Sequence, residues 1–247
     1  MFSERHETGY QNTSANCREI SAAGVSEIIM NTLIICNGRM KKHNKMYKLL
    51  KGYKRIIAVD GGVRHARKMG LKPDIVIGDF DSISEKDRNY VKKEKISLIK
   101  FPSIKDKTDS ELALDYCIAN GIKEITIVAY SGNRLDHTLA NITMFSTKSD
   151  KLNIRLVDLY NDSYIVNGDF TYESEDLTAD HFVSIIPMSA DISIENSRGL
   201  HYPVNGKKVE FGSTLCVSNY TSDRCFSLTV SAGNALIVIA KEKKNDQ

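Results

Sequence analysis

The chain has 247 residues, of which 41% are hydrophobic and 26% are charged, the balance of an ordinary globular protein rather than of a disordered or collagen-like chain. Its 34 basic and 31 acidic residues leave a net charge of +3, too small an excess for a dedicated nucleic-acid-binding surface. At roughly 150 residues per domain, the length predicts one large domain or two modest ones.

Residues 1–30 are expected to be a disordered tail outside the fold, because the first 27 residues are charged and lack the apolar core of a signal peptide. No apolar run approaches the length of a membrane span, which is about 18 residues. The five cysteines are odd in number and include no C-x-x-C pair, which argues against a disulfide framework and a zinc site and indicates reduced thiols. We therefore expect a cytoplasmic protein that binds neither membrane nor nucleic acid.

From residue 32 onward, short apolar runs alternate with amphipathic stretches, the pattern of strand and helix units around a parallel sheet. We expect strands at 32–36, 55–59, 74–78, 97–101 and 125–129. We expect helices at 42–50, 84–93, 108–120 and 135–146, and one more that follows residue 62 and ends at residue 69. Ligands of such sheets bind beyond the carboxyl ends of the strands, and the polar clusters of this sequence follow those ends.

After about residue 152 the helical pattern gives way to short alternating runs that predict strands at 154–159, 163–166, 182–186, 215–218, 226–230 and 236–240. The expected fold is an α/β domain with a mainly parallel, Rossmann-like sheet over residues 31–150. A smaller all-β domain, an antiparallel sandwich, is expected over residues 151–241, with a charged tail at 242–247.

The sharpest motif is Gly78-Asp79-Phe80-Asp81-Ser82, which directly follows a predicted strand. In an extended chain the carboxylates of Asp79 and Asp81 point the same way, so the pair can hold a hard cation through oxygen atoms. The alternative is that Asp81 and Ser82 only cap the next helix.

A second acidic cluster, residues 105–111, begins a helix after the following strand. Asp106 or Thr108 can cap this helix, and Thr108 and Glu111 have the spacing of a capping box. Asp109 is not needed for capping, and with Asp79 and Asp81 it would complete a three-oxygen Mg²⁺ site at one edge of the sheet. Magnesium with so few protein ligands implies a phosphorylated co-substrate.

The third cluster, residues 131–137, begins another helix. Gly132 and Asn133 suit a turn with positive φ, Arg134 offers paired donors to phosphate oxygens, and the helix start favours anions. His137 alone is weak evidence of catalysis, since it can simply pair with neighbouring carbonyls. The segment 60–62, Asp-Gly-Gly, is a fourth polar strand end, although such a segment is often only a turn.

Together the clusters indicate a magnesium-dependent enzyme that acts on a nucleotide polyphosphate. The sequence has no G-x-x-x-x-G-K-[ST] loop and no protein-kinase motifs, so its phosphate site is of another kind.

In order and spacing, these four clusters resemble the motifs of the thiamine pyrophosphokinase family, and the resemblance covers about residues 31–241. In the β-rich part, Gly199-Leu200-His201-Tyr202 and Val217-Ser218-Asn219 are similar to the family's thiamine-side motifs. The resemblance implies transfer of the diphosphoryl group of ATP to the hydroxyl of thiamine, giving thiamine diphosphate and AMP. It also implies a homodimer in which the thiamine site lies between two chains.

The resemblance implies the following residue roles. The catalytic residues would be Asp79, Asp81, Asp106, Asp109, Arg134 and Asp136, with Asp79, Asp81 and Asp109 as Mg²⁺ ligands. The ATP side would comprise Asp60, Gly61, Gly62, Asp79, Thr108, Arg134 and His137, and the thiamine side Tyr202, Ser218 and Asn219. The general base stays open between Asp79, Asp106 and Asp136.

Two features depart from the family pattern. The chain has no Trp, and Tyr202 stands where many relatives carry that larger ring; Tyr220 stands where bacterial relatives often carry an acidic residue. Two alternative functions stay open: a pyrophosphokinase for another heterocyclic alcohol, such as a hydroxymethylpterin, and a non-catalytic sensor of thiamine or nucleotide.

Overall fold

The computed structural model describes residues 31–101, 106–178, 180–221 and 223–241. The expectations for the tails at 1–30 and 242–247, and for Cys17, lie outside the described residues.

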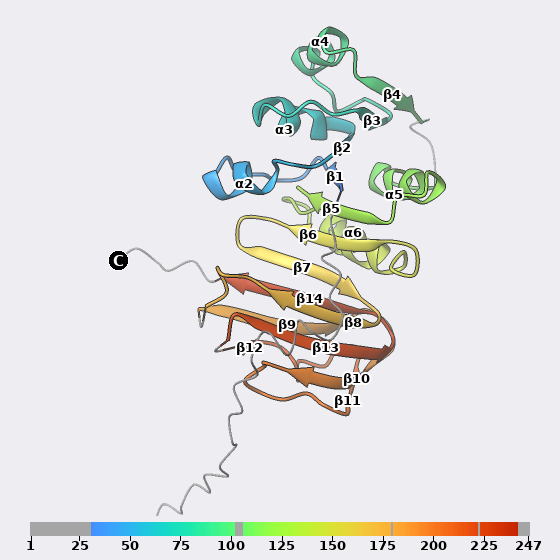
Figure 1. The fold of residues 1–247 in the computed structure, drawn as a ribbon. Coiled ribbons are helices and arrows are strands. Elements are labelled where there is room, and N and C mark those ends of the chain that lie inside the picture. Colours follow the sequence, from blue (N-terminus) through green and yellow to red (C-terminus); the bar gives the residue numbers. More distant parts are fainter. Residues whose placement is uncertain (1–30, 102–105, 179, 222, 242–247) are drawn as a thin grey trace, which may run out of the picture.

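The main feature is a ten-stranded sheet in which six parallel strands continue into four antiparallel ones (Figure 1). In spatial order the strands are β12 (Asn219–Tyr220), β9 (His181–Pro187), β14 (Ala235–Lys241), β7 (Asn161–Val166), β6 (Asn153–Val157), β5 (Glu124–Val128), β1 (Thr32–Ile35), β2 (Arg55–Val59), β3 (Ile75–Gly78) and β4 (Ser97–Lys100). The inner parallel strands β1 and β5 are rich in β-branched residues and buried on both faces, as their position between two layers of helices requires, whereas the edge strand β4 is mostly exposed.

Among the described residues, five α-helices cover the two faces of the parallel part: α2 (Asn44–Leu49), α3 (Val63–Lys68), α4 (Glu85–Lys93), α5 (Asp109–Ala119) and α6 (Leu135–Ser146). Helices α5 and α6 pack Leu114, Cys117 and Phe145 into the core on one face. Helices α2 and α3 pack Met46 and Ala66 on the other face, and α4 continues that layer (Figure 1). All the strands and helices expected between residues 32 and 146 are confirmed.

The helix starts follow capping chemistry. Thr108 accepts a hydrogen bond from the backbone N–H of Glu111 at 3.2 Å and caps α5, as its spacing predicts. The cap of α4 is Ser84, which accepts from the backbone N–H of Asp87 at 3.2 Å. The alternative in which Asp81 and Ser82 serve only as that cap is therefore wrong.

A second sheet of four antiparallel strands packs on the antiparallel part of the first. Its order is β11 (Lys207–Glu210), β10 (Asp191–Arg198), β13 (Cys225–Ala232) and β8 (Asp169–Glu173). Val183 and Ile237 of the large sheet share one core with Ile194, Phe226 and Leu228 of the small one. The predicted fold class, a mainly parallel α/β sheet followed by an antiparallel sandwich, is confirmed.

The strand predictions of the β-rich part are partly wrong. Residues 215–218 form turns, and the short strand there is β12 at 219–220. Strands β8, β10 and β11 were not expected, because their sequences are polar alternations without an apolar run. Strand β6 pairs in parallel with β5, so the main sheet continues across the predicted domain boundary at residue 150, and that boundary stays a prediction.

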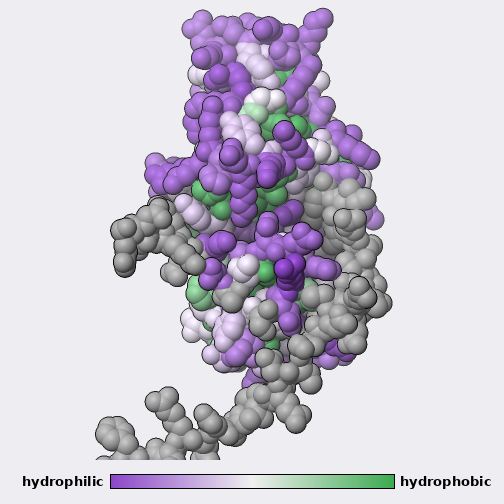
Figure 2. All heavy atoms as spheres, turned by 60° about the vertical axis from the view of Figure 1, so that its left-hand side comes forward, coloured by the Kyte–Doolittle hydropathy of each residue, from purple (hydrophilic) through white to green (hydrophobic). Residues whose placement is uncertain are grey.

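Cys36, Cys117 and Cys216 are free, buried thiols, as expected. The expectation is wrong for Cys225, which is disulfide-bonded. No helix of the described residues combines the length and the apolar character that crossing a membrane requires. The face in Figure 2 is mostly hydrophilic, most uniformly at the end of the molecule that carries α4.

Candidate active site

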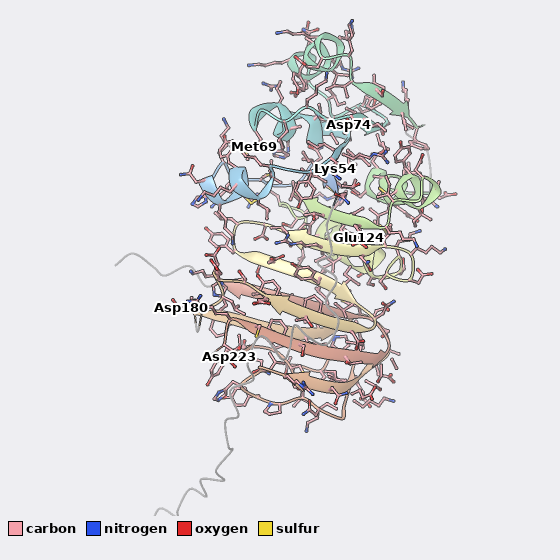
Figure 3. All side chains as sticks on the ribbon, viewed as in Figure 1. Lys54, Met69, Asp74, Glu124, Asp180 and Asp223 are labelled. Atoms are coloured by element: carbon pink, nitrogen blue, oxygen red, sulfur yellow. The ribbon has the colours of Figure 1, made fainter. Side chains whose placement is uncertain are left out.

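The carboxyl ends of β1, β2, β3 and β5 meet at one edge of the sheet, because these strands are parallel and adjacent. Asp74 and Glu124, labelled in Figure 3, lie at the beginnings of β3 and β5 and so mark the opposite edge. At the carboxyl edge a cavity of about 580 Å³ opens. Six of the predicted site residues line it: Asp60, Asp79, Thr108, Asp109, Arg134 and His137.

The backbone at this edge is bent sharply where the strands end. Three residues without the freedom of glycine have left-handed backbones: Asp60 (φ +47°), Phe80 (φ +68°) and Ala129 (φ +54°). Such conformations cost on the order of 1–3 kcal/mol each and gather at functional sites. Gly38 passes so close to the end of β5 that a Cβ there would overlap the carbonyl oxygens of Ala129 and Ser131.

The carboxylates of Asp60, Asp79 and Asp109 come together, each offering an oxygen within 4.8 Å of the others. Asp60 thus takes the place in the group that the sequence assigns to Asp81. The extended backbone assumed for the Asp79–Asp81 pair is absent, because the left-handed Phe80 between them turns the chain. Asp81 instead donates its backbone N–H to the Asp79 carboxylate at 3.1 Å.

Ser82 holds the Asp60 carboxylate in place. Its hydroxyl donates to Oδ2 of Asp60 and accepts from the backbone N–H of Gly61 at 3.0 Å and from Nδ2 of Asn37 at 3.0 Å. These bonds use the full hydrogen-bonding capacity of a hydroxyl. The other carboxylate oxygen of Asp60, Oδ1, is buried and has no hydrogen-bond partner.

This donor set fits a hard divalent cation. Mg²⁺ prefers carboxylate oxygens, and three of them converge here. A buried carboxylate oxygen without a partner is costly unless a cation faces it, so the unpartnered Oδ1 of Asp60 also fits a cation-binding group.

Four cationic side chains line the same cavity: Arg39, Arg64, Lys107 and Arg134. Arg64 donates to the backbone carbonyl of Asn37 at 3.0 Å. Nζ of Lys107 lies 2.6 Å from the Asp115 carboxylate, and this hydrogen bond raises the pKa of Lys107, which therefore stays charged. Arg134 extends into solvent, with 68% of its side chain exposed.

Arg134 pairs with Asp136 at 2.5 Å, and this has a consequence for proton transfer. The hydrogen bond from Arg134, with one from the backbone of His137, lowers the pKa of Asp136 to about 2. A carboxylate this acidic is a weak proton acceptor, which disfavours Asp136 among the three candidates for a general base.

The remaining predicted residues of this half do not line the cavity. Asp81, Asp106 and Asp136 are exposed beside it. Gly61 and Gly62 are buried in the single turn of 3₁₀ helix at 60–62. A Cβ on Gly61 would approach Asn37 and Ser82 within 2.7 Å, so its role is to let these side chains close around Asp60.

The three predicted thiamine-side residues lie in the β-rich half. Tyr202 is 60% exposed and joins His201 and Tyr220 in a cluster of rings, with His201 stacked on Tyr220 at 4.2 Å. Asn219 is buried, and its amide bonds the backbone of Tyr202 in both directions, accepting at 3.0 Å and donating at 2.8 Å. Ser218 has a left-handed backbone (φ +59°).

Within a single chain, these thiamine-side residues lie far from the acidic group formed by Asp60, Asp79 and Asp109. Strand β12, which carries Asn219 and Tyr220, is six strand positions from β1 in the large sheet. At 4.7–4.9 Å per strand, the separation is on the order of 28 Å.

Other cavity residues escaped the sequence analysis. Asn37, Arg39, Arg64 and Tyr130 come from strand ends or helix starts with no recognisable motif. The one usable signal was Asn37-Gly38, a turn pair that directly follows the first strand.

Comparisons with known proteins agree on one family. The profile "Thiamin pyrophosphokinase, catalytic domain" matches residues 46–156, and "Thiamin pyrophosphokinase, vitamin B1 binding domain" matches residues 172–237. A thiamine pyrophosphokinase of Bacillus subtilis (strain 168) is 34% identical over 165 residues, which cover 66% of this chain and 76% of the relative.

Solved structures give the same result. The crystal structure of thiamine pyrophosphokinase from Bacillus subtilis superposes with a TM-score of 0.76 at 27% identity, covering 86% of this chain and 99% of that one. Thiamin pyrophosphokinase from Geobacillus thermodenitrificans superposes with a TM-score of 0.73 at 25% identity, covering 86% and 98%.

Proposed function

The chain belongs to the thiamine pyrophosphokinase family, and we propose that it transfers the diphosphoryl group of ATP to the hydroxyl oxygen of thiamine, giving thiamine diphosphate and AMP. The observation that carries this proposal is the convergence of three carboxylates in a cavity that also holds Arg64, Lys107 and Arg134. Phosphoryl transfer needs charge neutralisation and positioning more than covalent help, and this cavity offers both.

Asp60, Asp79 and Asp109 would hold Mg²⁺, which when bound supplies positive charge to the phosphate oxygens. Asp81 would support the group through its hydrogen bond to Asp79. Arg64, Lys107 and Arg134 would bind the polyphosphate and stabilise the charge that builds up as AMP leaves. Of the three candidates for the general base, Asp79 and Asp106 remain after the acidic Asp136 is set aside.

We further propose a homodimer in which the β-rich half of one copy brings its thiamine-side residues to the acidic group of the other. The separation within one chain supports this, since a single copy leaves Tyr202 on the order of 28 Å from the site. Leu135 and Leu139, one turn apart on α6 beside the cavity, are 70% and 56% exposed, as unpartnered contact residues would be.

Product analysis tests the reaction. Purified protein incubated with ATP, Mg²⁺ and thiamine should release thiamine diphosphate and AMP in equal amounts, and Asp79→Asn should release neither. A parallel incubation with a hydroxymethylpterin tests the alternative substrate. AMP release with the pterin alone would overturn the substrate, and no AMP with either would favour the sensor.

Subunit complementation tests the shared site. Asp109→Asn damages the phosphate side, and Tyr202→Ala damages the thiamine side. A mixed dimer of the two variants contains one site without either defect, so at thiamine concentrations well below the KM mixing should give clearly more activity than each variant alone. Mixing without recovery, after verified exchange of subunits, would contradict a site built from two chains.

The proposed use of ATP as a co-substrate supports a cytoplasmic location. Activity found in the cytosolic fraction of the source cells would bear this out.

A further inference from the structure

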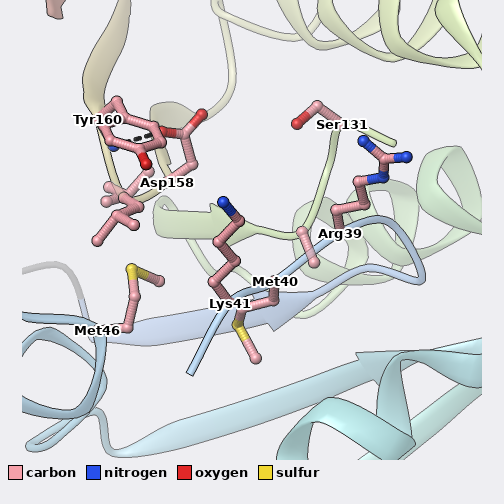
Figure 4. A pocket seen from close by; sticks show the side chains of 10 residues that line it. Arg39, Met40, Lys41, Met46, Ser131, Asp158 and Tyr160 are labelled. Carbon is pink, nitrogen blue, oxygen red and sulfur yellow. Dashed lines mark hydrogen bonds between the residues drawn. The ribbon is translucent and has the colours of Figure 1, made fainter. Parts of the chain in front are cut away.

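The four cationic side chains that line the cavity at the carboxyl edge of the sheet differ in what holds them. Arg64 is anchored to the backbone by a hydrogen bond of 3.0 Å, and Arg134 forms an ion pair at the start of α6. Arg39 lies beside Ser131, in the wall that the cavity shares with a smaller pocket of about 140 Å³ (Figure 4). Lys107 is different, because its ammonium group lies among carboxylates that are not part of the cavity lining.

Lys107 belongs to a group of four charged side chains beside the cavity. Its Nζ lies 2.6 Å from the Asp115 carboxylate and 3.7 Å from the Glu111 carboxylate. Nζ of Lys148 lies 3.1 Å and 3.6 Å from the same two carboxylates. Each carboxylate is therefore shared by two lysines, and the formal charges of the group cancel.

This group connects the cavity to the space between two helices. Asp115 and Glu111 lie on α5, Lys148 follows the end of α6, and Lys107 precedes the N-cap of α5. Of the four side chains, only Lys107 lines the cavity. Asp109 of the acidic group begins α5, and Asp115 lies about 9 Å further along the helix axis. The ion pair with Asp115 thus draws the ammonium of Lys107 along the helix and away from Asp109.

Lys148 is held more firmly than Lys107. Its side chain is 20% exposed, against 47% for Lys107, whose flexible stem can turn in solvent at little cost. Burial disfavours the charged form of Asp115, but the hydrogen bonds from both lysines outweigh it and hold the pKa of Asp115 below its ordinary value. With Lys107 turned away, Lys148 would still face both carboxylates, so neither would be left without a cation.

We propose that Lys107 exchanges partners when a polyphosphate enters the cavity, leaving Asp115 and Glu111 for phosphate oxygens while Lys148 stays to neutralise the two carboxylates. This inference rests on the proposed function, because it requires a polyphosphate in the cavity. Asp115 and Lys148 are then positioning residues that set the affinity for polyphosphate without touching it. Asp115 competes with phosphate for Lys107, and Lys148 weakens that competition.

The test measures the binding of inorganic tripolyphosphate by calorimetry at a fixed Mg²⁺ concentration. Lys107→Gln removes the cation that moves, Asp115→Asn removes its competing partner, and Lys148→Gln removes the cation that stays. The last two substitutions are also made in the Lys107→Gln background. Asp191→Asn is the matched control, because it removes the carboxylate of another Lys–Asp pair, with Nζ of Lys208 at 2.9 Å, in the β-rich half. Melting temperatures verify folding.

We expect Lys107→Gln to weaken tripolyphosphate binding by about tenfold, the scale of one lost charge-assisted hydrogen bond. Asp115→Asn should strengthen binding by about threefold, and Lys148→Gln should weaken it by about threefold, with recovery in Lys148→Arg. Asp191→Asn should leave it unchanged. In the Lys107→Gln background, the substitutions of Asp115 and Lys148 should have much smaller effects, because the cation through which they act is gone.

Unchanged affinity in Lys107→Gln, or no binding of tripolyphosphate by the wild type, would overturn this inference. So would changes of the same sign, or no change, in Asp115→Asn and Lys148→Gln, as expected of a group that only joins two helices. Effects of full size in the Lys107→Gln background would also overturn it, because they would come from the general field of the charges. Glu111→Gln is a second carboxylate variant, expected to act in the same direction as Asp115→Asn. Failure of the proposed function shows differently, since the wild type would then form no thiamine diphosphate, whereas the tripolyphosphate affinities do not depend on the reaction.

Discussion

The two halves of this molecule carry their proposed ligand-binding residues in different ways. In the α/β half, each site residue follows a strand of the parallel sheet, and the geometry of that sheet gathers them into a cavity within one chain. In the β-rich half, Tyr202 and its neighbouring rings lie on an exposed surface beside the edge strand β12, on the order of 28 Å from the acidic group of Asp60, Asp79 and Asp109 in the same chain. The α/β half thus forms a nearly complete site within one chain. The β-rich half presents only a surface, which would need the acidic group of a second chain to complete a site.

The largest expected effect is that of Asp60→Asn, which removes one of the three converging carboxylates in the α/β half. Replacing one converging carboxylate oxygen by an amide nitrogen should lower kcat by about a hundredfold to a thousandfold and raise the Mg²⁺ concentration for half-maximal activity. Steady-state kinetics over a Mg²⁺ series measures both. Activity near that of the wild type would show that Asp60 stands beside the metal and does not hold it.

Tyr202→Ala tests the other half. The KM for thiamine should rise by about tenfold and the KM for ATP should stay the same, because the ring contributes apolar contact to only one substrate. The melting temperature should not change, since the side chain is largely exposed. Equal changes in both KM values would contradict the division of ligands between the halves.

Ser82 and Ser84 form a matched pair within one loop. Ser82→Ala removes the support of Asp60 and should reduce activity at low Mg²⁺ by about tenfold, with partial recovery at high Mg²⁺. Direct binding of Mn²⁺, followed by its electron paramagnetic resonance signal, should weaken in parallel. Ser84→Ala removes the cap of α4 and the hydrogen bond from Ser84 to the Asp87 carboxylate, and should cost about 1–2 kcal/mol of unfolding free energy without changing metal binding. Identical behaviour of the two variants would refute a positioning role for Ser82.

The smallest expected effect concerns pH, and each half contributes one histidine. Burial lowers the pKa of His65 and of His181 from the ordinary 6.5. The unfolded chain therefore takes up protons first as the pH falls below about 6.5, and the folded state loses stability down to the lowered pKa values. Urea unfolding between pH 7.5 and 5.5 should show this decline, with a shallower slope in His65→Gln and in His181→Gln. If the slope of unfolding free energy against pH is unchanged in one variant, that histidine does not contribute to the pH dependence.

The fold of the α/β half could be predicted almost residue by residue, because its strands are apolar runs and its helices carry explicit caps such as Thr108. The β-rich half was harder. Strand β10, with the sequence DISIENSR, buries only alternate side chains over part of its length and has no apolar run to reveal it. Its partner β13 is also distant in the sequence, so no local turn indicates that pairing.

The candidate site shows the same limit at the level of single residues. The motifs identified Asp79 and Asp109 and placed them at one edge. They suggested Asp81 as the third member because the pair was assumed to be extended. The left-handed backbone of Phe80 is a property of the folded loop that the residue type does not reveal, since phenylalanine rarely adopts it. For the same reason the close contact between Asp60 and Ser82, 22 residues apart, could not be foreseen.

Strand β14 gives the chain an order of assembly. It lies between β7 and β9 in the large sheet, and β9 and β12 reach the remaining strands only through it. During synthesis β9 therefore leaves the ribosome before the strand that will bind it exists, and its apolar residues Val183 and Ile185 have no sheet to join until residues 235–241 follow. The α/β half has no such delay, so a newly made chain can fold its cavity while the edge of its β-rich half is still open to pairing with other chains.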